Sequence, residues 1–224
     1  MSAPPQRPCA AMILAAGRGE RLRPLTDSIP KPLLRVRGRP LIERHVLGMA
    51  RAGINRIVIN LCWLGSQIRD HLGDGARYGV AITYSEEQPQ ALETGGGIFH
   101  ALPHLEPGPF AVVSGDIYTD FPFETLALAP DRDAHLVLVP NPPYHRAGDF
   151  GLDRGLALAQ AASRHTFGNI AVYRDAFFAG CSGGVFPLKP LLVRAMVSRR
   201  CSAELYTGLW ENVGTVAQLE SLNA

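Results

Sequence analysis

Apolar residues in this chain of 224 residues gather in short runs, and between the runs they recur at helical spacing. Residues 10–16 form a nearly unbroken apolar run, ended by Gly17 and Gly19, that indicates a buried strand. Residues 40–52 carry apolar side chains at helical spacing, and Gly53 stands where the helix would end. The same reasoning predicts strands over residues 56–60, 81–85, 110–113 and 135–139, and helices over residues 65–72 and 94–105. Strands that are apolar on both faces and alternate with helices favour an α/β fold, with a mostly parallel mixed sheet flanked by helices.

The second half of the chain is less regular. Its pattern predicts a loop over residues 141–151, a strand over 166–173, a helix over 188–199 and a short strand over 205–209 before the segment 216–222. Internal repeats, low-complexity tracts and linkers are absent from the sequence. We therefore expect a single domain over residues 1–224, with the polar, Pro-rich residues 1–9 as a flexible N-terminal extension.

The composition, 46% hydrophobic and 19% charged, is that of a globular protein. A net charge of +2 gives no reason to expect nucleic acid or an anionic membrane as a partner. The sequence has no run of about 18 apolar residues that could span a membrane, and its first residues lack the pattern of a signal peptide. The four cysteines have no C-x-x-C spacing, so we expect reduced thiols in a cytoplasmic protein.

Chemically suggestive residues follow two of the predicted strands. Residues 17–23 come after the first strand, and Gly115 and Asp116 come after the strand over residues 110–113. In a mostly parallel sheet, ligands bind beyond the carboxyl ends of the strands. The sequence therefore predicts a binding site at this edge of the sheet.

The loop after the first strand is the most informative segment, with the sequence LAAGRGERLRPLT over residues 14–26 and PKPL over residues 30–33. A Gly-rich turn exposes backbone N–H groups to an oxyanion or a base edge. Small residues let a ligand approach the main chain closely, and they are Ala15, Ala16, Gly17 and Gly19. Four positive charges suit a polyphosphate, and they are Arg18, Arg21, Arg23 and Lys31. The alternative is an ordinary turn with solvated arginines; the sequence lacks both the third glycine of the dinucleotide-binding pattern and the G-K-[ST] of a Walker loop.

These residues resemble the bacterial sugar-1-phosphate nucleotidyltransferases, also called sugar-nucleotide pyrophosphorylases. The pattern L-A-A-G-x-G-x-R-L-x-P-L-T followed by P-K-P-L carries the resemblance. It extends in the family's order over residues 92–98, 114–116, 148–151 and 210–215, and so over nearly the whole chain. The resemblance implies a Rossmann-like nucleotidyltransferase fold. It also implies an enzyme that forms an NDP-sugar and pyrophosphate from a nucleoside triphosphate and a sugar 1-phosphate.

Within the family, the chain is most similar to the short enzymes of peptidoglycan recycling. That likeness implies UTP and N-acetylmuramate 1-phosphate as the substrates. Other sugar or alcohol phosphates remain open, such as mannose 1-phosphate with GTP. So does a protein that binds nucleotide sugars without turning them over, and the oligomeric state is open as well.

The resemblance implies that the nucleotide binds at the first loop, at residues 86–89 and at the glycine triplet over residues 95–97. The expected nucleotide-binding residues are Ala15, Ala16, Gly17, Gly19, Glu20, Arg21, Gly95 and Gly96. As catalytic residues, Arg21 is expected to hold the leaving pyrophosphate, and Lys31 to bridge the α-phosphate and the sugar phosphate. Both roles are physically sound, because phosphoryl transfer needs in-line positioning and neutralised charge more than covalent help.

Asp116 follows a buried strand and a glycine, which would present its carboxylate at the edge of the sheet. A hard oxygen ligand suits Mg²⁺ together with substrate phosphates, although a turn-capping aspartate is the alternative. The family's usual second metal ligand is an aspartate in W-x-D-V-G-T, and here the corresponding residue is Asn212. An amide oxygen can still ligate Mg²⁺, but the site loses one formal negative charge; a structural turn residue is the other reading.

For the sugar we expect contacts from Asp149 and from the backbone at Phe150 and Gly151, with Ser114 and Asn169 as further polar groups. Family members often have Asn in the place of Ser114 and Gly in the place of Asn169. Both differences leave the identity of the sugar open, and for Asn169 a purely structural role is the alternative.

Overall fold

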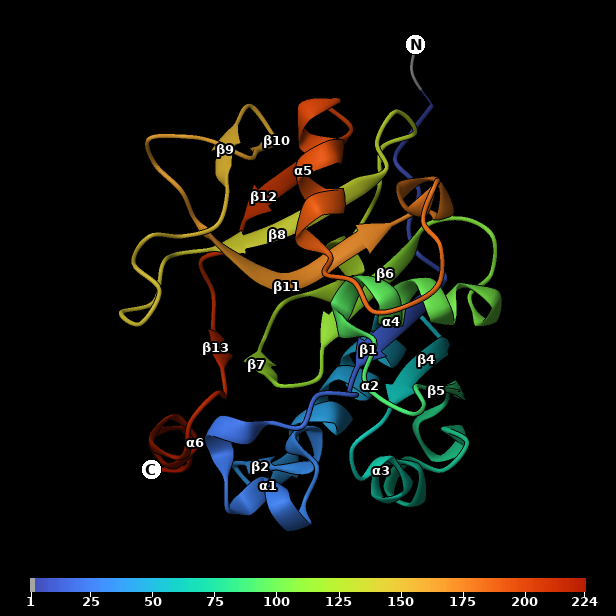
Figure 1. Cartoon of the computed structure of the whole chain (residues 1–224), viewed down its shortest axis with the longest axis vertical. Coiled ribbons are helices and arrows are strands. Elements are labelled where there is room, and N and C mark those ends of the chain that lie inside the picture. The colour runs from blue at the N-terminus through green and yellow to red at the C-terminus, as the bar shows by residue number, and fades with distance from the viewer. Residues whose placement is uncertain (1–2) are drawn as a thin grey trace.

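The computed structural model describes residues 3–224 and consists of a large sheet with helices on both faces (Figure 1). The nine-stranded sheet has the order β5-β4-β1-β6-β11-β8-β12-β10-β9. Its strands are β1 (Ala10–Leu14), β4 (Arg56–Leu61), β5 (Ala81–Glu86), β6 (Phe110–Ser114), β8 (Ala134–Val139), β9 (Gly151–Asp153), β10 (Leu156–Leu158), β11 (Thr166–Tyr173) and β12 (Cys201–Leu205). Two small sheets pair β2 (Arg35–Val36) with β3 (Arg39–Pro40), and β7 (Ile117–Thr119) with β13 (Trp210–Asn212).

The α-helices are α1 (Leu25–Ser28), α2 (Leu41–Arg51), α3 (Gly65–Leu72), α4 (Glu93–Ala101), α5 (Lys189–Val197) and α6 (Val216–Asn223). None of these helices, in the part of the chain that the structure describes, has the length and apolar character needed to cross a membrane.

Strand direction divides the large sheet into two halves. In the first half β5, β4, β1 and β6 run parallel. In the second half β11 lies antiparallel to both β6 and β8, β12 returns parallel to β8, and β10 and β9 continue antiparallel. A mixed sheet flanked by helices confirms the predicted fold class, and its parallel half is the part that carries the first loop.

The side chains of β1 show how the two faces of the sheet are covered. Ala10 and Met12 belong to a buried cluster that includes residues of α4 and α5. Ala11 and Ile13 belong to a second cluster that includes residues of α2 and α3. This alternation is the period of two that a strand imposes, and it makes the sheet the middle of three layers (Figure 1).

Most predicted elements are confirmed to within one or two residues at each end. The strand predicted over residues 205–209 is wrong, because β12 already ends at Leu205 and the next strand, β13, begins at Trp210. In β12 the buried residues are the small Cys201 and Ala203, which leave only a weak apolar pattern in the sequence. Pairing with β8, and not local propensity, therefore decides where this strand lies.

The helix predicted over residues 94–105 is shorter in the structure. α4 ends at Ala101, and a 3₁₀ turn over Leu102–His104 follows it. Pro103 explains the change, because a proline has no backbone N–H and cannot donate the hydrogen bond that would continue the α-helix.

The start of the chain is tied to the fold at Gln6. This residue exchanges two backbone hydrogen bonds with Leu128, with N···O distances of 2.9 and 2.8 Å. The flexible extension over residues 1–9 stays a prediction, and residues 1 and 2 of it lie outside the described residues.

The C-terminal helix brings β13 close to the N-terminal part of the chain. A third buried cluster joins Val36 and Leu41 to Val213, and Leu219 of α6 packs against it. Thr215 caps α6, since its Oγ1 accepts a hydrogen bond from a backbone N–H of the first turn. Val213, next to Asn212, thus lies near residues 36 and 41, although the two segments are far apart in the sequence.

His45 of α2 is buried, with 2% of its surface exposed. We expect this residue to make the free energy of unfolding depend on pH, with lower stability in acid. Burial lowers the pKa of His45 from 6.5 to about 4, against a backbone hydrogen bond with Ile117 that raises it. Between these two values the unfolded chain binds a proton at His45 while the folded chain keeps the imidazole neutral. The free energy of unfolding should therefore fall as the pH is lowered through this window, by about 3 kcal/mol at most from this residue.

Urea unfolding at pH values above, within and below the window measures this effect. His45→Leu should flatten the pH dependence relative to the wild type. His104→Leu, at an exposed position, should leave it unchanged. An equal pH dependence in the wild type and in His45→Leu would contradict the assignment.

Candidate functional site

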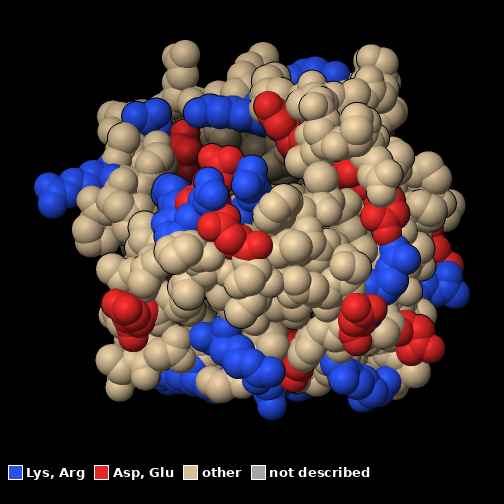
Figure 2. All heavy atoms as spheres, turned by 60° about the horizontal axis from the view of Figure 1, so that its bottom comes forward, with Lys and Arg blue, Asp and Glu red and all other residues tan. Residues whose placement is uncertain are grey.

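Two neighbouring cavities meet at the start of α4. The smaller, about 200 Å³, is lined mainly by residues at or after the ends of β1, β4, β5 and β6. The larger, about 570 Å³, is lined mainly by residues from the second half of the chain. Glu93 and Thr94 line both cavities. Figure 2 shows a hollow in the molecular surface, with basic and acidic side chains gathered around it.

The loop after β1 forms one wall of the smaller cavity. Ala15, Ala16 and Gly17 line the cavity, and their small size leaves the main chain accessible. Gly19 stands outside the lining and has a φ of 69°. A Cβ at Gly19 would lie 3.1 Å from side-chain carbons of Thr26 and Lys31. Glycine is therefore required for the shape of this turn.

Apart from Lys31, the charged residues of the loop are exposed. The guanidinium of Arg18 lies 4.4 Å from the ring centroid of Trp63, a cation–π geometry. Glu20 and Arg21 lie on a 3₁₀ turn and face solvent. The guanidinium of Arg21 lies close to the segment after β13. A Cβ on Gly214 would be 3.1 Å from Arg21 Nη2.

Lys31 and Asp116 form an ion pair at the smaller cavity. The side chain of Lys31 is 11% exposed and that of Asp116 is 20% exposed. Ser114, the last residue of β6, donates a hydrogen bond from its Oγ to Asp116 Oδ1 at 2.7 Å. β1 and β6 are parallel neighbours, so the segments after both strands meet at one edge. The structure thus brings three of the predicted site residues together.

The pairing of β7 with β13 brings Asn212 beside Asp116. Asn212 is opposite Ile117, and the backbone N–H of Val213 donates to the Asp116 carbonyl oxygen at 3.0 Å. The Oδ1 of Asn212 is buried and has no hydrogen-bond partner within residues 3–224. A buried oxygen without a partner is uncommon. It can ligate a cation or accept a hydrogen bond from a ligand. In the same described part of the chain, no group of three or more His, Cys, Asp or Glu side chains is arranged to hold a metal.

Two buried polar side chains, Asn60 and Glu87, also line the smaller cavity, with exposures of 4% and 1%. Asn60 Oδ1 accepts from the Ala15 N–H at 2.8 Å, and its Nδ2 donates to Glu87 Oε1 at 2.6 Å. Glu87 Oε2 accepts from the Leu92 N–H at 2.7 Å. These bonds connect the loop after β1 to the segment before α4. Sequence reasoning missed Asn60, although a polar residue near the end of an apolar strand is a usable signal.

The predicted nucleotide-binding glycines of α4 are packed under another segment. Gly95 and Gly96 are buried, and the Gly96 N–H donates to the Phe186 carbonyl oxygen at 3.0 Å. A Cβ on Gly96 would overlap the carbonyl oxygen of Gly184, and one on Gly95 would press on the Phe186 ring. Both glycines stand outside the residues that line the two cavities. Close packing accounts for their small size, and their contact with a nucleotide stays a prediction.

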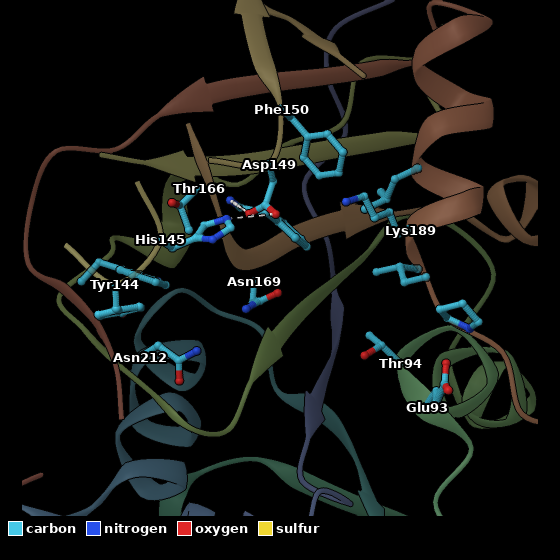
Figure 3. Close-up of a pocket in the computed structure, with 15 residues that line it drawn as sticks. Glu93, Thr94, Tyr144, His145, Asp149, Phe150, Thr166, Asn169, Lys189 and Asn212 are labelled. Carbon is cyan, nitrogen blue, oxygen red and sulfur yellow. Dashed lines mark hydrogen bonds and ion pairs between the residues drawn. The ribbon is translucent and has the colours of Figure 1, made fainter. Parts of the chain in front are cut away.

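Two of the four predicted sugar-binding residues, Asp149 and Asn169, line the larger cavity (Figure 3). Asp149 Oδ2 accepts from the Phe167 N–H at 2.9 Å, and its Oδ1 lies 3.2 Å from His145 Nε2. Asn169 has a φ of 53° and lies where the register between β11 and β8 shifts. A β-bulge of this kind redirects a side chain, here toward the cavity.

The other two predicted sugar-binding residues lie elsewhere. Ser114 lines the smaller cavity. Gly151 begins β9, and a Cβ there would overlap the Cβ of Ala161. The small size of Gly151 is therefore explained by packing, and a backbone contact with the sugar stays a prediction.

Sequence reasoning missed most of the larger cavity. Its apolar wall consists of Phe150, Phe167, Pro187, Leu188, Leu192 and Trp210. Its further polar groups are Thr94, Tyr144, His145, Thr166 and Lys189. These residues come from separate segments that only the fold brings together, so no local motif marks them.

Three comparisons with known proteins identify the family and its relatives. The model of the Nucleotidyl transferase family matches residues 10–154. The chain is 48% identical over 223 residues to the N-acetylmuramate alpha-1-phosphate uridylyltransferase of Neisseria meningitidis serogroup B, with 96% of each chain covered. It is 33% identical over 225 residues to the protein of the same name from Caulobacter vibrioides, with 93% of each covered.

Among solved structures, a Bacillus anthracis protein in complex with a sucrose has a TM-score of 0.83 at 20% identity, over 96% of this chain and 93% of that one. At this identity the likeness concerns the fold alone. The family match and the two relatives confirm the resemblance drawn from the first loop.

Gly96→Ala should lower the free energy of unfolding by about 1–3 kcal/mol, because the new methyl group must displace the backbone at Gly184. Gly183→Ala is the matched control, since nothing lies within 4 Å of a Cβ at that position. Urea unfolding of both variants measures the difference. Equal stability of Gly96→Ala and Gly183→Ala would show that α4 is not packed in this way.

Proposed function

The chain belongs to the nucleotidyl transferase family, and from that premise we propose that it transfers a uridylyl group from UTP to N-acetylmuramate 1-phosphate. The products would be UDP-N-acetylmuramate and pyrophosphate. The observation that carries the proposal is the ion pair of Lys31 and Asp116 beside the loop after β1. The choice of base and sugar is supported by the two uridylyltransferase relatives, which match nearly the whole chain.

The proposed reaction is an in-line displacement at the α-phosphorus of UTP. An oxygen of the sugar phosphate forms the new P–O bond, while the bond from the α-phosphorus to the oxygen bridging to the β-phosphorus breaks. Pyrophosphate leaves with that electron pair. A phosphate monoester loses its second proton at about pH 6, so the attacking oxygen is anionic at neutral pH and needs no general base.

The main barrier to such a reaction is the crowding of negative charge, which fixed cations offset. We assign Lys31 to the space between the α-phosphate and the sugar phosphate, and Arg21 to the leaving pyrophosphate. The role of Lys31 is supported by its burial and by Asp116, which holds its ammonium group at the cavity. The role of Arg21 is supported by its exposed guanidinium beside Gly214.

Mg²⁺ is the cofactor that we propose, with Asp116 and Asn212 as its protein ligands. The pairing of β7 with β13 brings the two residues together along the backbone. A carboxylate and a buried amide oxygen that accepts no hydrogen bond from the described residues are both oxygen ligands that suit a hard cation. Two protein ligands suffice, because Mg²⁺ keeps waters and takes substrate phosphates as further ligands. When bound, the metal would neutralise phosphate charge. The Ser114 hydroxyl and Lys31 hold the Asp116 carboxylate in one orientation.

We assign the nucleotide to the smaller cavity and the sugar to the larger one. The backbone of Ala15, Ala16 and Gly17 would approach the nucleotide, and Asp149 and Asn169 would contact the sugar. The two cavities meet at the start of α4, so the α-phosphorus and the attacking oxygen would face each other near that junction.

We place the reaction in the cytoplasm, as a step of peptidoglycan recycling. All four cysteines are free thiols, which is the usual state in a reducing compartment.

A matrix of nucleoside triphosphates and sugar phosphates tests the proposal. The purified chain is incubated with UTP, GTP or CTP, with N-acetylmuramate, mannose or glucose 1-phosphate, and with Mg²⁺ or EDTA, and pyrophosphate is measured. We expect the highest kcat/KM with UTP and N-acetylmuramate 1-phosphate, and no release in EDTA. A preference for GTP with mannose 1-phosphate would assign the chain to another activity of the family. Nucleotide binding without pyrophosphate from any pair would favour a non-catalytic protein, and Asn212→Asp would then test whether the missing charge is the cause.

Lys31→Met should lower kcat by about 100-fold or more, because it removes a fixed cation from the reacting phosphates while it keeps the unbranched shape and most of the length of the side chain. The KM for UTP should change less, since the other contacts of the loop remain. Thermal unfolding establishes that the variant is folded. Arg56→Met, which breaks an exposed ion pair with Glu106, is the control and should keep kcat within about twofold of the wild type. An unchanged kcat in folded Lys31→Met would refute the assigned role.

A further inference from the structure

Lys189 is a cation without an acidic partner in the larger cavity. It is the first residue of α5, it is exposed, and it forms no ion pair within residues 3–224. Figure 3 shows its side chain extending into the cavity from α5, with the ammonium group toward the side of Asp149 and His145. The first turn of a helix disfavours a positive charge, so the position of Lys189 is not explained by the stability of α5.

Two acidic groups line the larger cavity, and neither forms an ion pair with Lys189 within residues 3–224. Asp149 has other contacts, since it accepts a hydrogen bond from the Phe167 N–H and its second oxygen lies beside His145. Glu93 is exposed and begins α4, on a different element from Lys189 (Figure 3). The charge of Lys189 is therefore left for a ligand.

The surroundings of Lys189 specify the shape of that ligand. Its neighbour Leu188 is buried, and Leu192 of α5 lines the same wall together with Phe150. A cation next to an apolar wall suits a group that carries a negative charge on a short aliphatic stem.

The phosphates of the substrates have their own cations at the other end of the site. Lys31 lines the smaller cavity and Lys189 lines the larger one, and neither residue contributes to the other lining. Lys189 also comes from the second half of the chain, whereas Arg21 and Lys31 come from the first loop. A second anionic group, on the sugar itself, is the partner that this arrangement leaves for Lys189.

We infer that Lys189 determines specificity by binding a carboxylate carried by the sugar of the acceptor. The inference rests on the proposed function and deepens it. N-acetylmuramate bears a carboxylate on a lactyl ether, which has a short aliphatic stem, whereas N-acetylglucosamine has a hydroxyl group in its place. A free cation in the cavity favours the acidic sugar, because binding the neutral sugar leaves that cation without a partner.

Steady-state kinetics with two acceptors test this role. Lys189→Met is compared with the wild type, using UTP with N-acetylmuramate 1-phosphate or N-acetylglucosamine 1-phosphate. We expect kcat/KM to fall about 10- to 100-fold for the acidic sugar and less than about twofold for the neutral one. The KM for UTP should stay constant. Lys189→Arg should retain most of the preference, and Arg51→Met, which removes an exposed cation at the end of α2, should change neither acceptor.

Two kinetic outcomes would overturn the inference. An equal loss for both acceptors would mean that Lys189 acts on the phosphate that they share. No loss for the acidic sugar would mean that its carboxylate binds elsewhere.

Product binding separates this inference from the proposed function, because it requires no turnover. Calorimetry with UDP-N-acetylmuramate and UDP-N-acetylglucosamine gives the preference of each variant. If the wild type prefers the acidic product and Lys189→Met loses that preference, the inference holds even for a chain that releases no pyrophosphate. If the wild type shows no preference, or Lys189→Met keeps it, the inference fails even for an active uridylyltransferase.

Discussion

The ion pair of Lys31 and Asp116 is the interaction on which the rest of the site depends. Its contribution to stability is small, because desolvation of two charges offsets most of their attraction. Its contribution to geometry is larger, since it joins the loop after β1 to the turn after β6. The parallel pairing of these two strands makes the contact possible, as both end at the same edge of the sheet. The ammonium group of Lys31, which we propose meets the phosphates, is thus fixed before any ligand arrives, and this is the preorganisation that charge-stabilising sites require.

Buried packing maintains the shape of the surrounding cavity. Asn60 and Glu87 tie the first loop to the segment before α4 through a chain of hydrogen bonds that is withdrawn from water. The glycines of α4 then allow the segment containing Gly184 and Phe186 to lie directly on the helix. The main chain of the loop is therefore held in place, so that it needs little further ordering when a nucleotide binds, whereas the exposed arginines must still become ordered.

The parts of the site that could be predicted are those whose signal is local. Gly17, Lys31 and Asp116 stand in short segments next to strands, and the edge of a parallel sheet is the place where such segments meet. The role of Gly96 could not be predicted from a local pattern. A side chain at this position would overlap the backbone of Gly184, which is distant in the sequence. Lys189 was not predicted either, because an unfavourable lysine at a helix start indicates no particular ligand until the fold places it at a cavity. For the fold, buried strands of β-branched residues were predicted well, whereas the small residues of β12 were not.

The division of the sheet into two halves bears on how such a protein can evolve. Apart from Glu93 and Thr94, the smaller cavity is lined by residues up to Asp116 and the larger by residues from Tyr144 onward. If the larger cavity holds the acceptor, as proposed, mutations in the later part of a gene can explore new acceptors while most residues that line the donor cavity are conserved. Asn212 is the exception, because it lies in the later part of the chain and is a proposed ligand of the metal. After a gene duplication, one copy can then diverge in its acceptor and keep its chemistry as long as Asn212 is retained.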